Sequence, residues 1–195
     1  MKVPLEQPIN KYVTDQNIPD SIKVKHVLSH TSQGEVGKHF YYSSRFSWLM
    51  KVIEKEIGGS FDSIVNASIV KPNGLHHTFL LKDTTNLIGK KVAKPYVFEG
   101  ETKPGFIDYG YSSASGIVST VRDIAKFGKL VEKIPEGKYN YGRFSQVVDG
   151  HQMLWAYGQY DCYSSLFIKI PDKDLIVVMA ANNSLMSDPR KVDLW

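Results

Sequence analysis

The 195-residue sequence predicts an α+β domain, because helical patterns fill its first part and strand patterns fill its last. Apolar residues recur at spacings of three and four in several segments before residue 140. From Tyr141 onward, short apolar runs alternate with turn residues. We therefore expect one domain, residues 1–195, in which residues 1–140 are mainly helical and loop and residues 141–195 form antiparallel strands.

The first part is expected to begin with an extended or loop-like stretch, because residues 1–20 contain three prolines. Four helices should follow, and their predicted ranges are residues 22–28, 44–58, 61–70, and a segment that Ser119 or Thr120 caps and that ends near Pro135. The second helix should stop at Gly58. Residues 84–110 are expected to be loop-like, with short extended pieces.

Four strands are predicted in the last part, and their ranges are Phe144–Val148, Met153–Tyr157, Ser164–Ile170 and Leu175–Ala181. Turn residues such as Asp149-Gly150 and Pro171-Asp172 separate these runs. The sequence therefore predicts a meander of consecutive hairpins.

The charges exclude some classes of function. The chain has 24 basic and 20 acidic residues, which give a net charge of +4, and they are scattered along the sequence. Neither the lysines at 90, 91 and 94 nor the helix face from Lys126 to Lys133 amounts to a nucleic-acid-binding stripe, so we expect no nucleic-acid partner. The longest apolar run is too short to span a membrane, and residues 1–5 lack the pattern of a secretory signal.

Four segments, in order along the chain, carry a family resemblance. They read I-K-V-K-H-V-L-S-H-T-S at 22–32, F-Y-Y-S-S at 40–44, S-G-I-V-S-T-V-R-D-I-A at 115–125 and W-A-Y-G-Q at 155–159. Together they resemble the serine β-lactamase and penicillin-binding-protein family, which includes class C β-lactamases, DD-peptidases and esterases. Gln33, which stands before Gly34, departs from that pattern. The resemblance implies a β-lactamase/DD-peptidase-like fold with helices packed against a C-terminal antiparallel sheet.

The resemblance also implies a chemistry. In this family, the serine of a Ser-x-x-Lys turn attacks an amide or ester carbonyl and forms an acyl-enzyme. That motif should precede Pro8, but only seven residues do so and none is serine. We therefore expect the N-terminal strands and the nucleophile helix to be missing and the chain to be inactive or impaired. The one Ser-x-x-Lys string, Ser68 to Lys71, lies directly before the turn at residues 72–75, which resembles a structural passage of the family. Chance readily supplies such a string, so Ser68 is not expected to be a nucleophile.

Several site residues are implied by the same resemblance. Tyr42 matches the tyrosine that relays a proton, and Ser44 replaces an asparagine that contacts substrate. The expected substrate-binding strand contains Tyr157, Gly158 and Gln159, and the backbone N–H of Gln159 would polarise the substrate carbonyl.

Two features of the sequence argue against a basic substrate-binding residue and against a metal site. Ala156 stands where the family has a basic residue, so substrate carboxylates lose a partner. His26 and His30 lie four residues apart without the glutamate of a zinc motif, so no metal is expected, and no motif indicates a cofactor.

Three interpretations therefore remain from the sequence. The first is a serine hydrolase chain for a small-molecule or peptide substrate with an amide or ester bond. The second is a non-catalytic protein of the same fold that binds a peptide or cell-wall-like ligand. The third is a fragment whose exposed sheet edge promotes self-association. The sequence assigns no compartment, although full-length relatives are often exported.

Overall fold

The computed structural model describes residues 3–14, 16–41, 43–98, 101–131, 141–142, 144–160 and 162–183. The chain divides into two compact units that are interleaved along the sequence. The first unit takes its described residues from 1–80, 111–118 and 133–143, and the second takes them from 81–110, 119–132 and 144–195.

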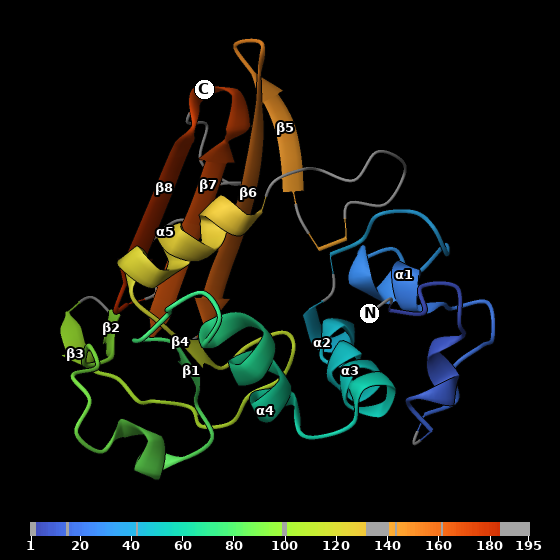
Figure 1. The fold of residues 1–195 in the computed structure, drawn as a ribbon, viewed down its shortest axis with the longest axis horizontal. Helices are drawn as coiled ribbons and strands as arrows, with labels where there is room; N and C mark the ends of the chain where they lie inside the picture. The colour runs from blue at the N-terminus through green and yellow to red at the C-terminus, as the bar shows by residue number, and fades with distance from the viewer. Residues whose placement is uncertain are drawn as a thin grey trace. The chain divides into compact units, whose positions relative to one another are not determined.

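The first unit is built from short helices (Figure 1). They are the 3₁₀ helix η1 (Ile9–Lys11), α1 (Val24–Leu28), α2 (Ser43–Phe46), α3 (Leu49–Ile57), α4 (Phe61–Val65) and the π-helical turn Asn66–Val70. A two-residue strand β1 (Phe79–Leu80) pairs antiparallel with β4 (Ile117–Val118), so the segment from Tyr111 to Val118 belongs to this unit.

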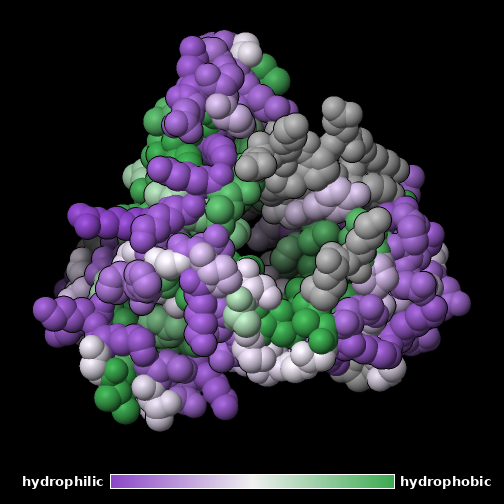
Figure 2. All heavy atoms as spheres, in the orientation of Figure 1, coloured by the Kyte–Doolittle hydropathy of each residue, from purple (hydrophilic) through white to green (hydrophobic). Residues whose placement is uncertain are grey.

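The core of the first unit lies between its N-terminal segment and α3. Its buried side chains are those of Ile9, Val13, Ile18, Ile22, Val24, Val27, Leu49 and Val52. Because these residues come from extended, 3₁₀ and α-helical segments, no single periodicity describes them. On the face drawn in Figure 2, hydrophilic side chains predominate at the far right, where Figure 1 draws blue segments of the first unit.

The second unit is an antiparallel sheet with one helix packed on it. The strands β5 (Phe144–Val148), β6 (His151–Tyr160), β7 (Tyr163–Ile170) and β8 (Leu175–Ala181) are adjacent in chain order. This meander confirms the predicted strands, although β6 is longer than expected. A separate hairpin joins β2 (Tyr96–Phe98) to β3 (Thr102–Pro104).

Helix α5 (Val121–Leu130) lies across β7 and β8 in Figure 1. Thr120 caps it, because its Oγ1 accepts a hydrogen bond from the Asp123 N–H at 3.2 Å. Gly128 allows close packing, since a Cβ at this position would lie 2.6 Å from Phe167 and 3.3 Å from Ile176. The helix and its cap were predicted correctly, but it ends at Leu130, earlier than expected; Pro135 lies outside the described residues.

Cys162, in the turn between β6 and β7, is fully buried. Its Sγ lies against Gly105, where an added Cβ would approach to 2.4 Å. The neighbouring segment is tied to the end of the sheet by hydrogen bonds from Tyr163 Oη to the Ala93 carbonyl and from Asn182 Nδ2 to the Lys94 carbonyl. The thiol therefore fills a packed position rather than a strand edge.

The predicted helix over residues 44–58 was wrong as a single element. The structure has two helices there, α2 and α3, separated by a turn at Ser47 and Trp48. The sequence between residues 43 and 57 contains neither glycine nor proline, so the interruption has another cause. That cause is a hydroxyl from a distant segment, considered below.

Candidate functional site

The predicted site residues fall in both units of the chain. Ser44 belongs to the first unit, where it is exposed on α2. Tyr157, Gly158 and Gln159 lie together on β6 of the second unit. Tyr42, the predicted proton relay, lies outside the described residues.

The turn between β5 and β6 fixes the orientation of the β6 backbone. Asp149 and Gly150 have φ values of 49° and 77°, which define a two-residue turn of type I′. In such a turn the Val148 carbonyl accepts from the His151 N–H, so these two residues form a hydrogen-bonded pair. From His151 onward, alternate residues of β6 therefore direct their N–H and C=O groups toward the β5 side.

This alternation determines where the predicted donor points. The register with β5 and β7 is continuous along β6, without a bulge. The N–H and C=O groups of Tyr157 and Gln159 consequently face away from β7, toward the side on which β5 lies. β5 begins with Phe144, which pairs with Trp155, so the β5 strand does not extend alongside Gln159.

The side chains of this part of β6 divide between the two faces of the sheet. Gly158 pairs with Ser165, which is next to Ala180 on β8, and all three residues are exposed. They lie on the face of the sheet that α5 partly covers. Ser165 and Phe167 are two residues apart on β7, so their side chains point to the same face, and Phe167 lies against Gly128 of α5. The result is a row of small side chains across three strands.

The opposite face carries the Tyr157 and Gln159 side chains. The Tyr157 hydroxyl donates a hydrogen bond to Gln159 Oε1 at 3.0 Å. The N–H and C=O groups of Tyr157 and Gln159, in contrast, lie in the plane of the sheet and point to the β5 side. Ala156, at the position of the family's basic residue, is exposed on the same face as Gly158.

Helix α2 is held by aromatic packing in the first unit. The His30 ring stacks on Phe46, the last residue of α2, with ring centroids 5.1 Å apart, and the Tyr41 ring centroid lies 4.7 Å from that of His30 at an interplanar angle of 38°. His30 is buried and has a φ of 52°. Phe40, the first residue of the F-Y-Y-S-S segment, donates its backbone N–H to the His30 carbonyl at 2.8 Å, which closes the loop between them.

The two histidines considered as metal ligands lie in different environments. His26 is in α1, where its Nδ1 accepts from the Lys23 N–H at 3.1 Å, and burial lowers its pKa. His30 follows the end of that helix in a left-handed conformation, so the two rings do not share a helix face. Among the described residues, no group of three or more His, Cys, Asp or Glu side chains could hold a metal ion.

Ser68 and Lys71 are both exposed on the π-helical turn and the residue after it. A nucleophile of this class needs surroundings that exclude water and stabilise charge. Their exposure supports the interpretation of this Ser-x-x-Lys string as a chance occurrence.

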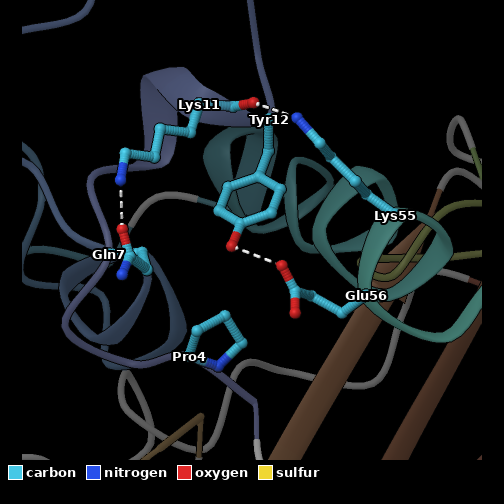
Figure 3. A pocket seen from close by; sticks show the side chains of 6 residues that line it. All are labelled: Pro4, Gln7, Lys11, Tyr12, Lys55 and Glu56. Atoms are coloured by element: carbon cyan, nitrogen blue, oxygen red, sulfur yellow. Dashed lines mark hydrogen bonds between the residues drawn. The ribbon is translucent and has the colours of Figure 1, made fainter.

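A surface cavity of about 320 Å³ lies elsewhere in the first unit (Figure 3). Its lining residues are Pro4, Gln7, Lys11, Tyr12, Lys55 and Glu56. The polar groups bond within the wall: Tyr12 donates to Glu56 at 2.7 Å and Lys55 donates to the Lys11 carbonyl at 2.8 Å. Burial and the Glu56 hydrogen bond raise the pKa of Tyr12 to about 12. None of the predicted site residues that the structure describes lines this cavity.

Comparison with known proteins identifies the family. The Beta-lactamase family profile matches residues 2–194, and the chain belongs to this family. No curated protein matches the chain.

Solved structures with a similar fold share little sequence with the chain. An octameric penicillin-binding protein homologue from Pyrococcus abyssi has 20% identity and a TM-score of 0.83, over 92% of this chain and 56% of that one. A D-stereospecific amidohydrolase from Streptomyces sp. has 15% identity and a TM-score of 0.75, over 96% and 77%. A class C β-lactamase has 15% identity and a TM-score of 0.76, over 95% and 73%.

These comparisons confirm the predicted β-lactamase-like fold. The chain spans little more than half of the Pyrococcus abyssi protein. In the part of the chain that the structure describes, no helix is long and apolar enough to cross a membrane.

Proposed function

We propose that this chain supplies the substrate-binding strand of a serine hydrolase that cleaves amide or ester bonds through an acyl-enzyme. The observation that carries the proposal is the direction of the Gln159 N–H, which faces away from β7 beyond the start of β5. An N–H fixed in a sheet and aimed to one side can stabilise negative charge on a substrate carbonyl oxygen without reorganising. Gly158, the residue before it, has no side chain, and Gly158 and Ser165 are both exposed.

Substrates of this kind have a planar amide or ester group with an acyl side chain. Several similar structures bear the names of amidases or of penicillin-binding proteins. These names support a D-amino-acid amide, a short peptide or a β-lactam as the probe class for this chain. The 195 residues by themselves should bind such a ligand without turnover, because their one Ser-x-x-Lys string is exposed.

The test measures binding and covalent labelling separately. Fluorescent penicillin should change its polarisation reversibly on addition of the chain, while intact mass after penicillin or fluorophosphonate treatment should show no adduct. An adduct that disappears in Ser68→Ala would make Ser68 the nucleophile, and one that persists would place the nucleophile at another residue. Either adduct would overturn binding without turnover.

A backbone variant tests the proposed donor directly. Gln159→Pro removes an N–H that faces away from β7, so the β6–β7 ladder keeps its hydrogen bonds. Penicillin binding should fall by about tenfold or more, corresponding to one lost charge-assisted donor. Gln159→Ala keeps the N–H and should bind like the unaltered chain; equal binding by both variants would refute the assignment.

Ala156 favours a second candidate function, that of a non-catalytic protein binding a peptide or cell-wall-like ligand. An alanine there cannot neutralise a substrate carboxylate or assist a proton transfer. If this function is correct, Ala156→Lys should leave affinity for a neutral peptide amide unchanged. If the hydrolase proposal is correct, the same variant should tighten binding of a ligand with a carboxylate by about tenfold.

We also propose that copies of the chain self-associate through the outer edge of β8. In the described part of the chain β8 pairs only with β7, and its seven residues include no charge and no proline. Such an edge is a template for a further strand. Sedimentation should show concentration-dependent association, and Met179→Lys, at a half-exposed position, should weaken it. A monomer at all concentrations would refute this proposal.

A further inference from the structure

The interruption between α2 and α3 is made by the side chain of Ser113. In a continuous α-helix the Met50 N–H would donate to the Phe46 carbonyl. Instead, Ser113 Oγ accepts from the Met50 N–H at 3.0 Å and donates to the Phe46 carbonyl at 2.7 Å. The hydroxyl therefore stands in the place of a backbone hydrogen bond, although Met50 N–H also reaches the Ser47 carbonyl at 3.2 Å.

Ser113 reaches this position because its own segment is anchored in the first unit. Tyr111 stacks on Phe61 of α4, with ring centroids 6.3 Å apart. On the other side, β4 pairs with β1 from Ile117. The serine is thus held from both sides while its hydroxyl enters the helix. Insertion of a side chain into the hydrogen-bond ladder is a recognised cause of helix breaks.

The break separates α2 from the longer α3 and fixes α2 at its last residue. The Phe46 carbonyl is held by Ser113, and the Phe46 ring is stacked on His30. Ser44 lies two residues before this anchored position. Closing the break would re-form one helix and shift the turn that carries Ser44.

We propose that Ser113 is a positioning residue, which sets α2 so that Ser44 can contact substrate. The inference rests on the proposed function, because it takes Ser44 as a substrate contact. Serine suits this role because one hydroxyl both donates and accepts. Threonine keeps that capacity, whereas alanine loses it.

The experiment compares three variants in the same chain. Ser113→Ala should weaken penicillin binding roughly fivefold to tenfold, as expected for the loss of a partly buried bridging hydroxyl. Ser113→Thr should restore it to within about twofold. The matched control is Ser112→Ala, since the Ser112 hydroxyl accepts from the nearby Ala114 N–H at 3.0 Å, within its own segment.

A second readout reports the position of α2 without any ligand. The backbone amide resonances of Ser44 and Ser47 should shift in Ser113→Ala, return in Ser113→Thr and stay in place in Ser112→Ala. A folded Ser113→Ala with unchanged resonances and unchanged affinity overturns the proposal. If the unaltered chain binds no penicillin, the proposed function fails, and the resonances alone decide the role of Ser113.

If Ser113→Ala does not fold, Ser113→Cys is measured in its place. A thiol is a weaker donor and acceptor but has nearly the same shape. We expect Ser113→Cys to lose part of the penicillin affinity and to show a Ser44 amide resonance that is partly shifted from its position in the unaltered chain. Affinity and resonances equal to those of the unaltered chain would overturn the proposal.

Discussion

In each of the two units, a side chain from a distant segment bonds to a helix at the point where that helix is interrupted or ends. The two side chains differ in charge. In the first unit, the neutral Ser113 hydroxyl bridges a carbonyl and an N–H. In the second unit, the buried Lys169 ammonium on β7 donates to the Gly128 carbonyl at 2.9 Å and to the Val131 carbonyl at 2.7 Å, at the C-terminal end of α5. A hydroxyl can satisfy both halves of a broken backbone bond, whereas an ammonium can serve only carbonyls.

The difference teaches where a charge is tolerated inside this protein. The C-terminal end of a helix carries partial negative charge and orphan carbonyls, which favour a cation. The middle of a helix has equal numbers of donors and acceptors, so a neutral group that does both fits there. Removing the lysine should therefore cost more than removing the serine.

The largest effect is expected for Lys169→Met. It leaves the buried Gly128 carbonyl and the half-buried Val131 carbonyl without their charged donor while keeping the aliphatic volume, and should lower the free energy of unfolding by about 3 kcal/mol. Urea unfolding at neutral pH measures the change. Lys173→Met, at an exposed position, is the control. A loss no greater than the control's would show that Lys169 contributes nothing through these bonds.

The next largest effect tests the close approach of α5 to the sheet. Gly128→Ala adds a Cβ at 2.6 Å from Phe167, so the helix must move away from β7. Overpacking should cost about 2 kcal/mol even after the better helix propensity of alanine is included. Combining it with Phe167→Leu should recover part of that loss. If Gly128→Ala stabilises the protein, α5 is not packed as closely as described.

A smaller effect is expected for the stability of Ser113→Ala. The Phe46 carbonyl and the Met50 N–H can pair with each other once the hydroxyl is gone, so the loss should be about 1 kcal/mol. Thermal unfolding measures it beside Lys169→Met. If Ser113→Ala is more destabilising than Lys169→Met, the expectation that removing the buried cation costs more than removing the neutral bridge is wrong.

The smallest effect concerns an exposed ion-pair cluster at the N-terminal segment. Hydrogen bonds from Lys23, at 2.8 Å, and then from Lys25 lower the pKa of Glu6 to about 2. Because the folded pKa lies below the ordinary value of 4.5, the stabilisation is complete above that pH and is lost as pH falls toward 2. Salt should weaken it further.

The measurement follows the melting temperature of Glu6→Gln from pH 7 to pH 3. The variant should be slightly less stable at pH 7, and its difference from the unaltered chain should shrink toward pH 3. Glu35→Gln, at an exposed position, should show no such convergence. A constant difference at all pH values would mean that the Glu6 carboxylate does not act through its charge.

Local signals in the sequence predicted much of the second unit. The threonine that caps α5 and the apolar runs of β5 to β8 each depend on residues close together in the chain. The Asp149-Gly150 pair also determines the register of β6, because these residues accept the left-handed conformation of a type I′ turn. The direction of the Gln159 N–H follows from that turn by alternation.

Other features could not be predicted from local patterns. The helix over residues 44–58 has the periodicity of one element, and the hydroxyl that divides it comes from 63 to 67 residues away. Lys169 interrupts an apolar strand and would be expected in solvent, but α5 places two carbonyls against it. The role of Tyr42 remains a prediction, since this residue lies outside the described part of the chain.

The sequence alone determined the fold class, the order of strands and the family of this protein, because periodicity, caps and turn residues act over a few positions. The tertiary structure decided where a helix breaks, which lysine is buried and which segment anchors α2. These outcomes depend on hydrogen-bonding groups that meet only after the chain has folded, when burial makes an unsatisfied carbonyl or N–H costly.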